Sequence, residues 1–192
     1  MKQNYVFESQ LWLPAPPEEV FEFFSKAENL QRITPSWLNF EFLTPLPIEI
    51  KQGSLIDYRL KLFGIPIHWK TEIAAWEPPN RFVDSQIKGP YQTWIHTHRF
   101  ESIKGGGTMM TDRVEYMPKG SLLAPLLDRL FVRRNVEKIF EYRREEILRI
   151  FADDPNHNGC KIGHIIDAKA YFKMLATLHD TIIGDALRDL SG

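Results

Sequence analysis

The feature that most constrains this fold is a series of alternating segments in the first two thirds of the chain, separated by proline and glycine. Apolar and polar side chains alternate strictly along residues 55–63 and again along residues 65–76, with Gly64 between them. Such alternation is typical of antiparallel strands that turn one face to the core and one to solvent. The predicted strands are residues 5–13, 40–43, 55–63, 65–76, 81–88, the segment around 94–100, and 108–117.

Helical segments surround this predicted sheet. Residues 16–19, Pro-Pro-Glu-Glu, open a first helix, because proline fits the first turn and acidic groups favour its positive end. A second short helix follows directly, and a long helical pattern with an apolar stripe runs from about 122 to 152. We expect one domain of residues 1–153, followed by a linker and an amphipathic helical extension of residues 154–192.

Composition excludes several classes of protein. The chain has 192 residues and a net charge of −1, which gives no bias toward nucleic acid or acidic membranes. The only cysteine, Cys160, excludes an intrachain disulfide and a multi-cysteine zinc site. No stretch approaches the roughly 18 apolar residues of a membrane span, and the start lacks a signal-peptide pattern. We expect a cytoplasmic location, no nucleic-acid partner and no integral membrane segment.

The strand at residues 94–100, Trp-Ile-His-Thr-His-Arg-Phe, carries an unusual mixture of side chains. Side chains alternate along a strand, so Trp94, His96, His98 and Phe100 share one face. A face with aromatic rings and imidazoles suits a partly polar cavity better than a dry core. We therefore expect this strand to form one wall of a pocket.

Antiparallel neighbours should extend that wall on both sides. Buried carboxylates are costly unless they are paired, and imidazole is a natural partner. An Asp–His pair in a cleft also tunes a histidine for proton transfer near neutral pH. The neighbouring strands are expected to contribute Phe82, Asp84 and Gln86 on one side, and Asp112, Val114 and Tyr116 on the other.

Three interpretations of this polar patch stay open. It is a hydrogen-bond network that fixes strand register, or it orients one polar end of a mostly apolar ligand, or it supplies a general acid and base. The candidate catalytic residues are His96, His98, Asp84 and Asp112. The candidate ligand contacts are Ile67, Trp69, Phe82, Gln86, Trp94, Phe100, Val114, Tyr116, Leu127 and Leu130.

A metal site is a further alternative, because His-x-His on a strand points both rings to one side. Asp84 or Asp112 would complete a three-ligand site with an open position. No further histidine is placed by a motif, so we expect no metal and no cofactor.

Several motifs resemble the SRPBCC superfamily, whose members include pollen-allergen-like, START lipid-transfer and polyketide cyclase/dehydrase proteins. The resemblance covers about residues 5–152 and implies an α+β helix-grip fold, in which a curved antiparallel sheet wraps around a long C-terminal helix with a cavity between them. The family is generally metal-free. The motifs are LPAPPEEVF at 13–21, AENL at 27–30 before Thr34-Pro35, Gly89-Pro90 before WIHTHRF at 94–100, and TDRVEY at 111–116.

Function stays open between three classes of protein. The first binds a small hydrophobic or amphipathic ligand such as a lipid, an isoprenoid or a polyketide-like compound. The second is a cyclase or dehydratase that uses a histidine–carboxylate pair, and the third is a non-catalytic regulatory or assembly module. The C-terminal helix either docks on its own domain or builds a homodimer.

Overall fold

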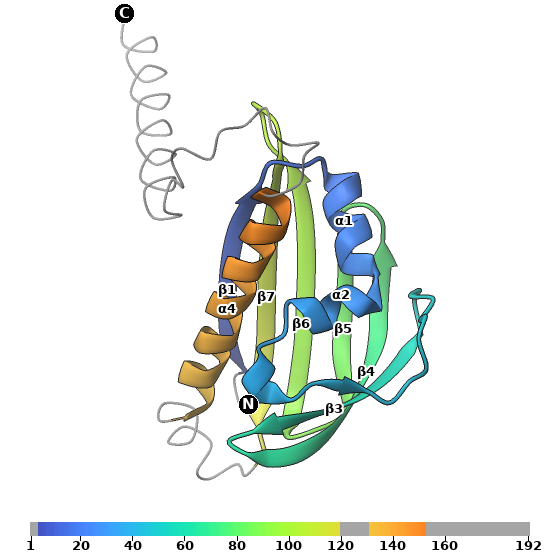
Figure 1. The fold of residues 1–192 in the computed structure, drawn as a ribbon, viewed down its shortest axis with the longest axis vertical. Helices are drawn as coiled ribbons and strands as arrows, with labels where there is room; N and C mark the ends of the chain where they lie inside the picture. The colour runs from blue at the N-terminus through green and yellow to red at the C-terminus, as the bar shows by residue number, and fades with distance from the viewer. Residues whose placement is uncertain (1–3, 120–130, 153–192) are drawn as a thin grey trace, which may run out of the picture. The chain divides into compact units, whose positions relative to one another are not determined.

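A single seven-stranded antiparallel sheet forms the framework of the protein (Figure 1). The computed structural model describes residues 4–119 and 131–152. The strand order across the sheet is β1-β7-β6-β5-β4-β3-β2. The strands are β1 (Tyr5–Leu13), β2 (Glu41–Phe42), β3 (Leu55–Leu62), β4 (Ile65–Glu77), β5 (Arg81–Lys88), β6 (Tyr91–Ser102) and β7 (Thr108–Pro118).

The helices among the described residues lie against the same face of the sheet. Figure 1 shows α4 running along β1 and β7, with α1 and α2 on the side of β5 and β6. Glu18 and Glu19 occupy the first turn of α1, and Lys26 has an extended backbone that separates α1 from α2. The helical elements are α1 (Pro17–Ser25), α2 (Ala27–Arg32), a 3₁₀ turn η1 (Ser36–Leu38) and α4 (Arg133–Ala152).

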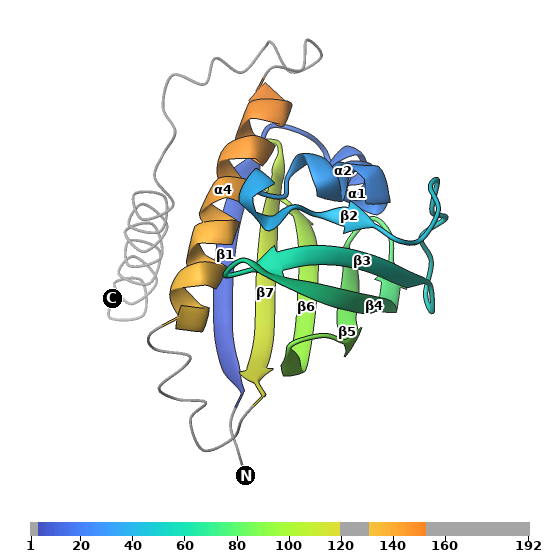
Figure 2. The ribbon, with the colours of Figure 1, turned by 60° about the horizontal axis from the view of Figure 1, so that its bottom comes forward.

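The sheet is strongly curved, and its curvature creates the concave face that holds the site. The β4–β5 pairing has two register shifts, between Lys70 and Thr71 and between Ile73 and Ala75. Irregularities of this kind bend a strand and increase its local twist. Figure 2 shows β3 and β4 curling toward the side where α4 and β2 lie.

Two clusters of buried apolar side chains lie on this concave face. The first includes Phe21 of α1, Phe100 of β6 and Ile147 of α4. The second includes Val114 of β7 and Val136 of α4. Because α4 contributes to both clusters, burial of its apolar stripe holds the helix across the sheet.

The α+β helix-grip fold predicted from the sequence is confirmed, with β1 and β5 at their predicted bounds. The predicted long helix is confirmed over Arg133–Ala152, whereas residues 122–130 lie outside the described residues. The extension at 154–192 lies there too, so the domain boundary and the dimer contact stay predictions. Within the described residues, no helix is long and apolar enough to cross a membrane.

Candidate functional site

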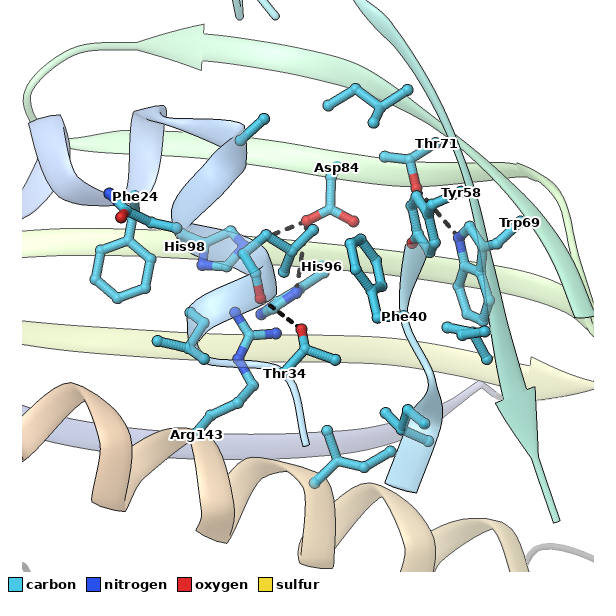
Figure 3. Close-up of a pocket in the computed structure, with 18 of the residues that line it drawn as sticks. Phe24, Thr34, Phe40, Tyr58, Trp69, Thr71, Asp84, His96, His98 and Arg143 are labelled. Carbon is cyan, nitrogen blue, oxygen red and sulfur yellow. Dashed lines mark hydrogen bonds and ion pairs between the residues drawn. The ribbon is translucent and has the colours of Figure 1, made fainter. Parts of the chain in front are cut away.

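A cavity of about 170 Å³ lies between the concave face of the sheet, the α1–α2 segment and α4. Figure 3 shows the side chains that project into it. Most of its lining is apolar, with aromatic rings from Phe24, Phe40, Trp69 and Phe140 among them. A small number of polar groups interrupts this lining, a pattern that is typical of small-molecule sites.

The main polar group of the wall is a cluster of four residues, Asp84, His96, His98 and Asp112, which we call the His–Asp cluster. Strand register brings it together: Asp84 of β5 pairs with His96 of β6, and Asp112 of β7 pairs with His98 of β6. Side chains of directly opposed residues share a face of the sheet. The pairing confirms five predicted neighbours of the histidine strand, whereas Gln86 lies beyond the paired residues of β5. The five are Phe82, Asp84, Asp112, Val114 and Tyr116.

Each carboxylate in the cluster contacts both imidazoles. Asp112 Oδ1 lies 2.9 Å from His96 Nε2, in a hydrogen bond, and 2.8 Å from His98 Nδ1. Asp84 Oδ2 lies 3.2 Å from His98 Nε2, again in a hydrogen bond, and 3.5 Å from His96 Nδ1. The short approach of His98 Nδ1 to Asp112 lacks hydrogen-bond geometry, so it is an electrostatic contact.

These contacts shift the pKa values of all four groups. Burial would raise the pKa of Asp84 and of Asp112, but hydrogen bonds and positive charge from the histidines lower both. Burial and the neighbouring His98 lower the pKa of His96. For His98 the two carboxylates outweigh burial and raise the pKa, which favours its imidazolium form beside a neutral His96.

The cluster has a cavity side and a protein side. Asp84, His96 and His98 line the cavity, whereas Asp112 is absent from its lining and contacts the two rings from the other side. The His98 ring also stacks on Phe82, with ring centroids 4.0 Å apart. The two rings are therefore fixed in orientation, with Asp84 beside their cavity-side nitrogen atoms.

A cation from α4 faces this patch across the cavity. Arg143 lines the cavity, and Figure 3 shows its guanidinium group projecting from α4 toward the polar wall. Its Nε atom is buried and has no hydrogen-bond partner among the described residues. The Arg143 charge also contributes to the lowered pKa of Asp84. This guanidinium is a natural partner for an anionic or strongly polar oxygen atom in the cavity.

A second polar point lies on β3 and β4. Thr71 Oγ1 accepts a hydrogen bond from Trp69 Nε1 at 3.1 Å and lies 3.3 Å from the Tyr58 hydroxyl. Burial, reinforced by the negative charge of Asp84, raises the pKa of Tyr58 and keeps its phenol neutral. This group gives the cavity neutral hydrogen-bonding capacity opposite its charged end.

The structure places the predicted ligand contacts in two groups. Trp69, Phe82 and Trp94 line the cavity. Five others do not: Ile67, Gln86, Phe100, Val114 and Tyr116. Leu127 and Leu130 lie outside the described residues.

The five misplaced contacts are a correction to the sequence interpretation, and their partners explain it. Phe100 packs against Phe21 and Phe24, and Val114 belongs to the apolar cluster under α4. The concave face is larger than the cavity, and helices cover the remainder of it. Tyr116 packs beside Tyr5, while Ile67 lies against the same apolar cluster as Val114.

Gln86 has a structural role in place of the predicted contact. Its Nε2 donates to the Tyr91 carbonyl oxygen at 2.7 Å, and its Oε1 accepts from the Tyr91 N–H at 3.2 Å. A Cβ atom on Gly89 would clash with the Gln86 side chain. Gln86 therefore closes the β5–β6 hairpin, and a side chain at position 89 would displace it from these hydrogen bonds.

Several lining residues were missed from the sequence, and Arg143 is the most informative. Arg143 is one of many charged residues in the long helix, so its residue type alone does not distinguish it. Its position in the sequence indicates the buried face of the helix, because Arg143 lies four residues from both Ile139 and Ile147 of the apolar stripe. Tyr58 and Thr71 lie on the cavity-facing sides of β3 and β4, and their proximity depends on the β3–β4 register.

The chain belongs to the polyketide cyclase/dehydrase and lipid transport family, whose sequence profile matches residues 13–141. This match confirms the resemblance drawn from the motifs. A search of curated protein sequences gave no significant match.

Solved structures with the same fold come from bacteria and a plant. The Zhui aromatase/cyclase from Streptomyces sp. R1128 is 14% identical, with a TM-score of 0.63 over 84% of this chain and 99% of that one. A protein from Chromobacterium violaceum is 15% identical, with a TM-score of 0.60 over 78% and 99%. Ginseng major latex-like protein 151 from Panax ginseng is 13% identical, with a TM-score of 0.58 over 78% and 99%. At these identities the similarity shows the fold.

Proposed function

We propose that this protein binds a small amphipathic molecule in the cavity, with the polar end of the ligand at Asp84, His96, His98 and Arg143. One observation carries this proposal: a mostly apolar cavity in which Asp84, the two histidines and Arg143 lie together on one part of the wall. Such a site buries the apolar part of a ligand and orients its polar atoms. The family match and the aromatase/cyclase neighbour support the same assignment.

The cavity volume limits the size of the proposed ligand. An apolar cavity of about 150 Å³ is large enough to bind benzene. The value of about 170 Å³ found here suits one aromatic ring or a short acyl chain and is too small for a lipid with two chains. We therefore favour a compact ligand with an acidic or hydroxyl oxygen, which Arg143 and the His–Asp cluster would bind. The cytoplasm stays the predicted location.

A second candidate function is cyclisation or dehydration of the bound molecule. It is favoured by the hydrogen bond between Asp84 and His98 on the cavity wall, which places a proton donor beside an acceptor. In this scheme His98 would donate a proton to a hydroxyl or carbonyl oxygen atom of the ligand. Asp84 or His96 would accept a proton from a carbon atom of the same ligand.

Ligand binding is tested with a matched pair of substitutions and a one-ring probe, 4-hydroxybenzoate, whose binding is measured by isothermal titration calorimetry. Ile139 lines the cavity, whereas Ile87 is 55% exposed on β5. We expect Ile139→Trp to fill the cavity and weaken probe binding at least tenfold, while Ile87→Trp leaves it unchanged. Equal affinity in all three proteins would contradict the proposal, and circular dichroism checks that each variant is folded.

Native mass spectrometry then separates binding from catalysis. Gently purified wild-type protein and Asp84→Asn are compared for any molecule that dissociates under denaturing conditions. A dehydratase would retain molecules that differ by one water between the two proteins, because the variant would keep the unreacted compound. A pure binding protein would retain the same compound in both.

A further inference from the structure

We propose that Asp84, His96 and His98 form a binding site for a divalent transition-metal ion on the cavity wall. Among the described residues, these three each offer a ligand atom within 4.8 Å of the other two. Figure 3 shows the three side chains converging from β5 and β6. Two imidazoles and one carboxylate are a suitable donor set for zinc, iron or cobalt.

The observed distances are close to those that a metal ion requires. Metal–nitrogen and metal–oxygen bonds near 2.0–2.2 Å place neighbouring ligand atoms roughly 3.0 Å apart in an octahedral site and roughly 3.4 Å apart in a tetrahedral one. Asp84 Oδ2 lies 3.2 Å from His98 Nε2 and 3.5 Å from His96 Nδ1. The two imidazole nitrogen atoms lie within 4.8 Å of each other, so a metal ion would draw the three side chains together around it.

Asp112 supplies the supporting contacts that metal-bound histidines need. A ligating histidine usually holds a carboxylate at its other ring nitrogen, which fixes the ring and its tautomer. Here Asp112 hydrogen-bonds His96 Nε2, opposite the proposed metal-binding Nδ1 atom. The same carboxylate oxygen lies 2.8 Å from His98 Nδ1, opposite the proposed Nε2 ligand. One carboxylate thus positions both rings.

Charge balance accommodates a divalent ion. The cluster holds two carboxylates and two imidazole rings, and all four side chains are at least four-fifths buried. Two buried carboxylates need compensating positive charge, which the His98 imidazolium and Arg143 supply in the metal-free protein. A divalent cation would replace the His98 proton in this role, because a ligating imidazole must be neutral.

The site has an open position toward the cavity, because its three ligands all line the cavity wall. A metal with three protein ligands retains a position for water or for a ligand atom. This inference does not require an organic ligand, so it stands or fails separately from the proposed function.

The test is a titration of chelator-treated, full-length protein with Zn²⁺ and with Co²⁺. Calorimetry measures the affinity for each ion, and visible absorption reports on the coordination of Co²⁺. We expect one ion per chain at the site. Asp84→Asn and His98→Gln should each weaken binding at least 100-fold and remove the Co²⁺ spectrum. Asp112→Asn should weaken binding about 10–100-fold, as for other supporting carboxylates. Ile139→Trp should retain metal binding, even where probe binding is lost.

Two controls exclude binding at other histidines. His68→Gln alters the exposed pair that His68 forms with Asp57. A combined His157→Gln, Cys160→Ser, His164→Gln and His179→Gln variant removes the histidine and cysteine side chains after residue 153. Neither should change the affinity of the main site. Retained affinity in Asp84→Asn, or its loss in either control, would overturn the proposal.

A measurement on the wild-type protein decides the case if the cluster variants fail to fold. Paramagnetic Co²⁺ should shift the imidazole proton resonances of His96 and His98 strongly and leave those of His68 unchanged. Shifts confined to the other histidines, or no binding at all, would refute the site.

Discussion

Two histidine–aspartate groups on the same sheet differ mainly in their surroundings. On the outer surface, Asp57 contacts His68 Nε2 at 2.8 Å and Lys70 Nζ at 3.0 Å. In the His–Asp cluster, Asp112 contacts His96 and His98 at nearly the same distances. The side chains of His68 and Lys70 are 42% and 33% exposed, whereas those of His96 and His98 are 5% and 4% exposed.

The comparison teaches that contact distance alone says little about energy or function. In the surface group, water solvates every charge, and side-chain entropy opposes the ion pairs. In the buried cluster, each charge relies on its protein partners, so the orientation of each ring is fixed. Only the buried group faces a cavity, and only it brings two imidazoles to one carboxylate.

The largest expected effect comes from removing a buried carboxylate. In metal-free protein, Asp112→Ala should lower the free energy of unfolding by on the order of 3–5 kcal/mol, because it leaves buried His96 Nε2 without its hydrogen-bond partner and removes one of the two carboxylates beside His98. Asp57→Ala should cost at most about 1 kcal/mol. Urea denaturation of both variants measures the difference, and equal losses would show that burial does not distinguish the two groups.

A double-mutant cycle sharpens the comparison at the level of one pair. The cycle of Asp112→Asn and His96→Gln should give a coupling energy of roughly 0.5–3 kcal/mol, since the pair shares one buried network. The matched cycle of Asp57→Asn and His68→Gln should give about 0.2–1 kcal/mol. A larger coupling in the surface pair would contradict the account.

The smallest effect is the pH response of the surface group. The Lys70 hydrogen bond, assisted by His68, lowers the pKa of Asp57. The stabilisation it contributes is therefore present above the unfolded pKa of roughly 3.9 and lost as pH falls through the lower folded value. The stability difference between wild type and Asp57→Asn should shrink toward zero in acid and also at high salt. A difference that persists under both conditions would be inconsistent with a solvated ion pair.

The sequence was sufficient to predict the strands and the composition of the cluster. Alternation with a period of two places His96 and His98 on one face, and the turn positions then set Asp84 and Asp112 beside them. These features are local, so one sequence reveals them.

The extent of the cavity could not be predicted in the same way. Whether Phe100 or Trp94 meets the cavity depends on where α1 and α4 cross the sheet, which is a property of tertiary packing. Asp112 occupies the protein side of the cluster for the same reason. Predicting Arg143 required knowledge of which helical face is buried, and Gln86 hydrogen-bonds the backbone of its own hairpin, where it does not line the cavity.

The central claim is that a ligand in the cavity contacts the buried histidines. Imidazole ¹⁵N–¹H correlation spectra of metal-free protein, recorded while the one-ring probe 4-hydroxybenzoate is added, test it most directly. The account predicts that the resonances of His96 and His98 shift in proportion to probe occupancy, while those of His68 stay constant. A probe that saturates the protein without moving the His96 and His98 resonances would contradict it.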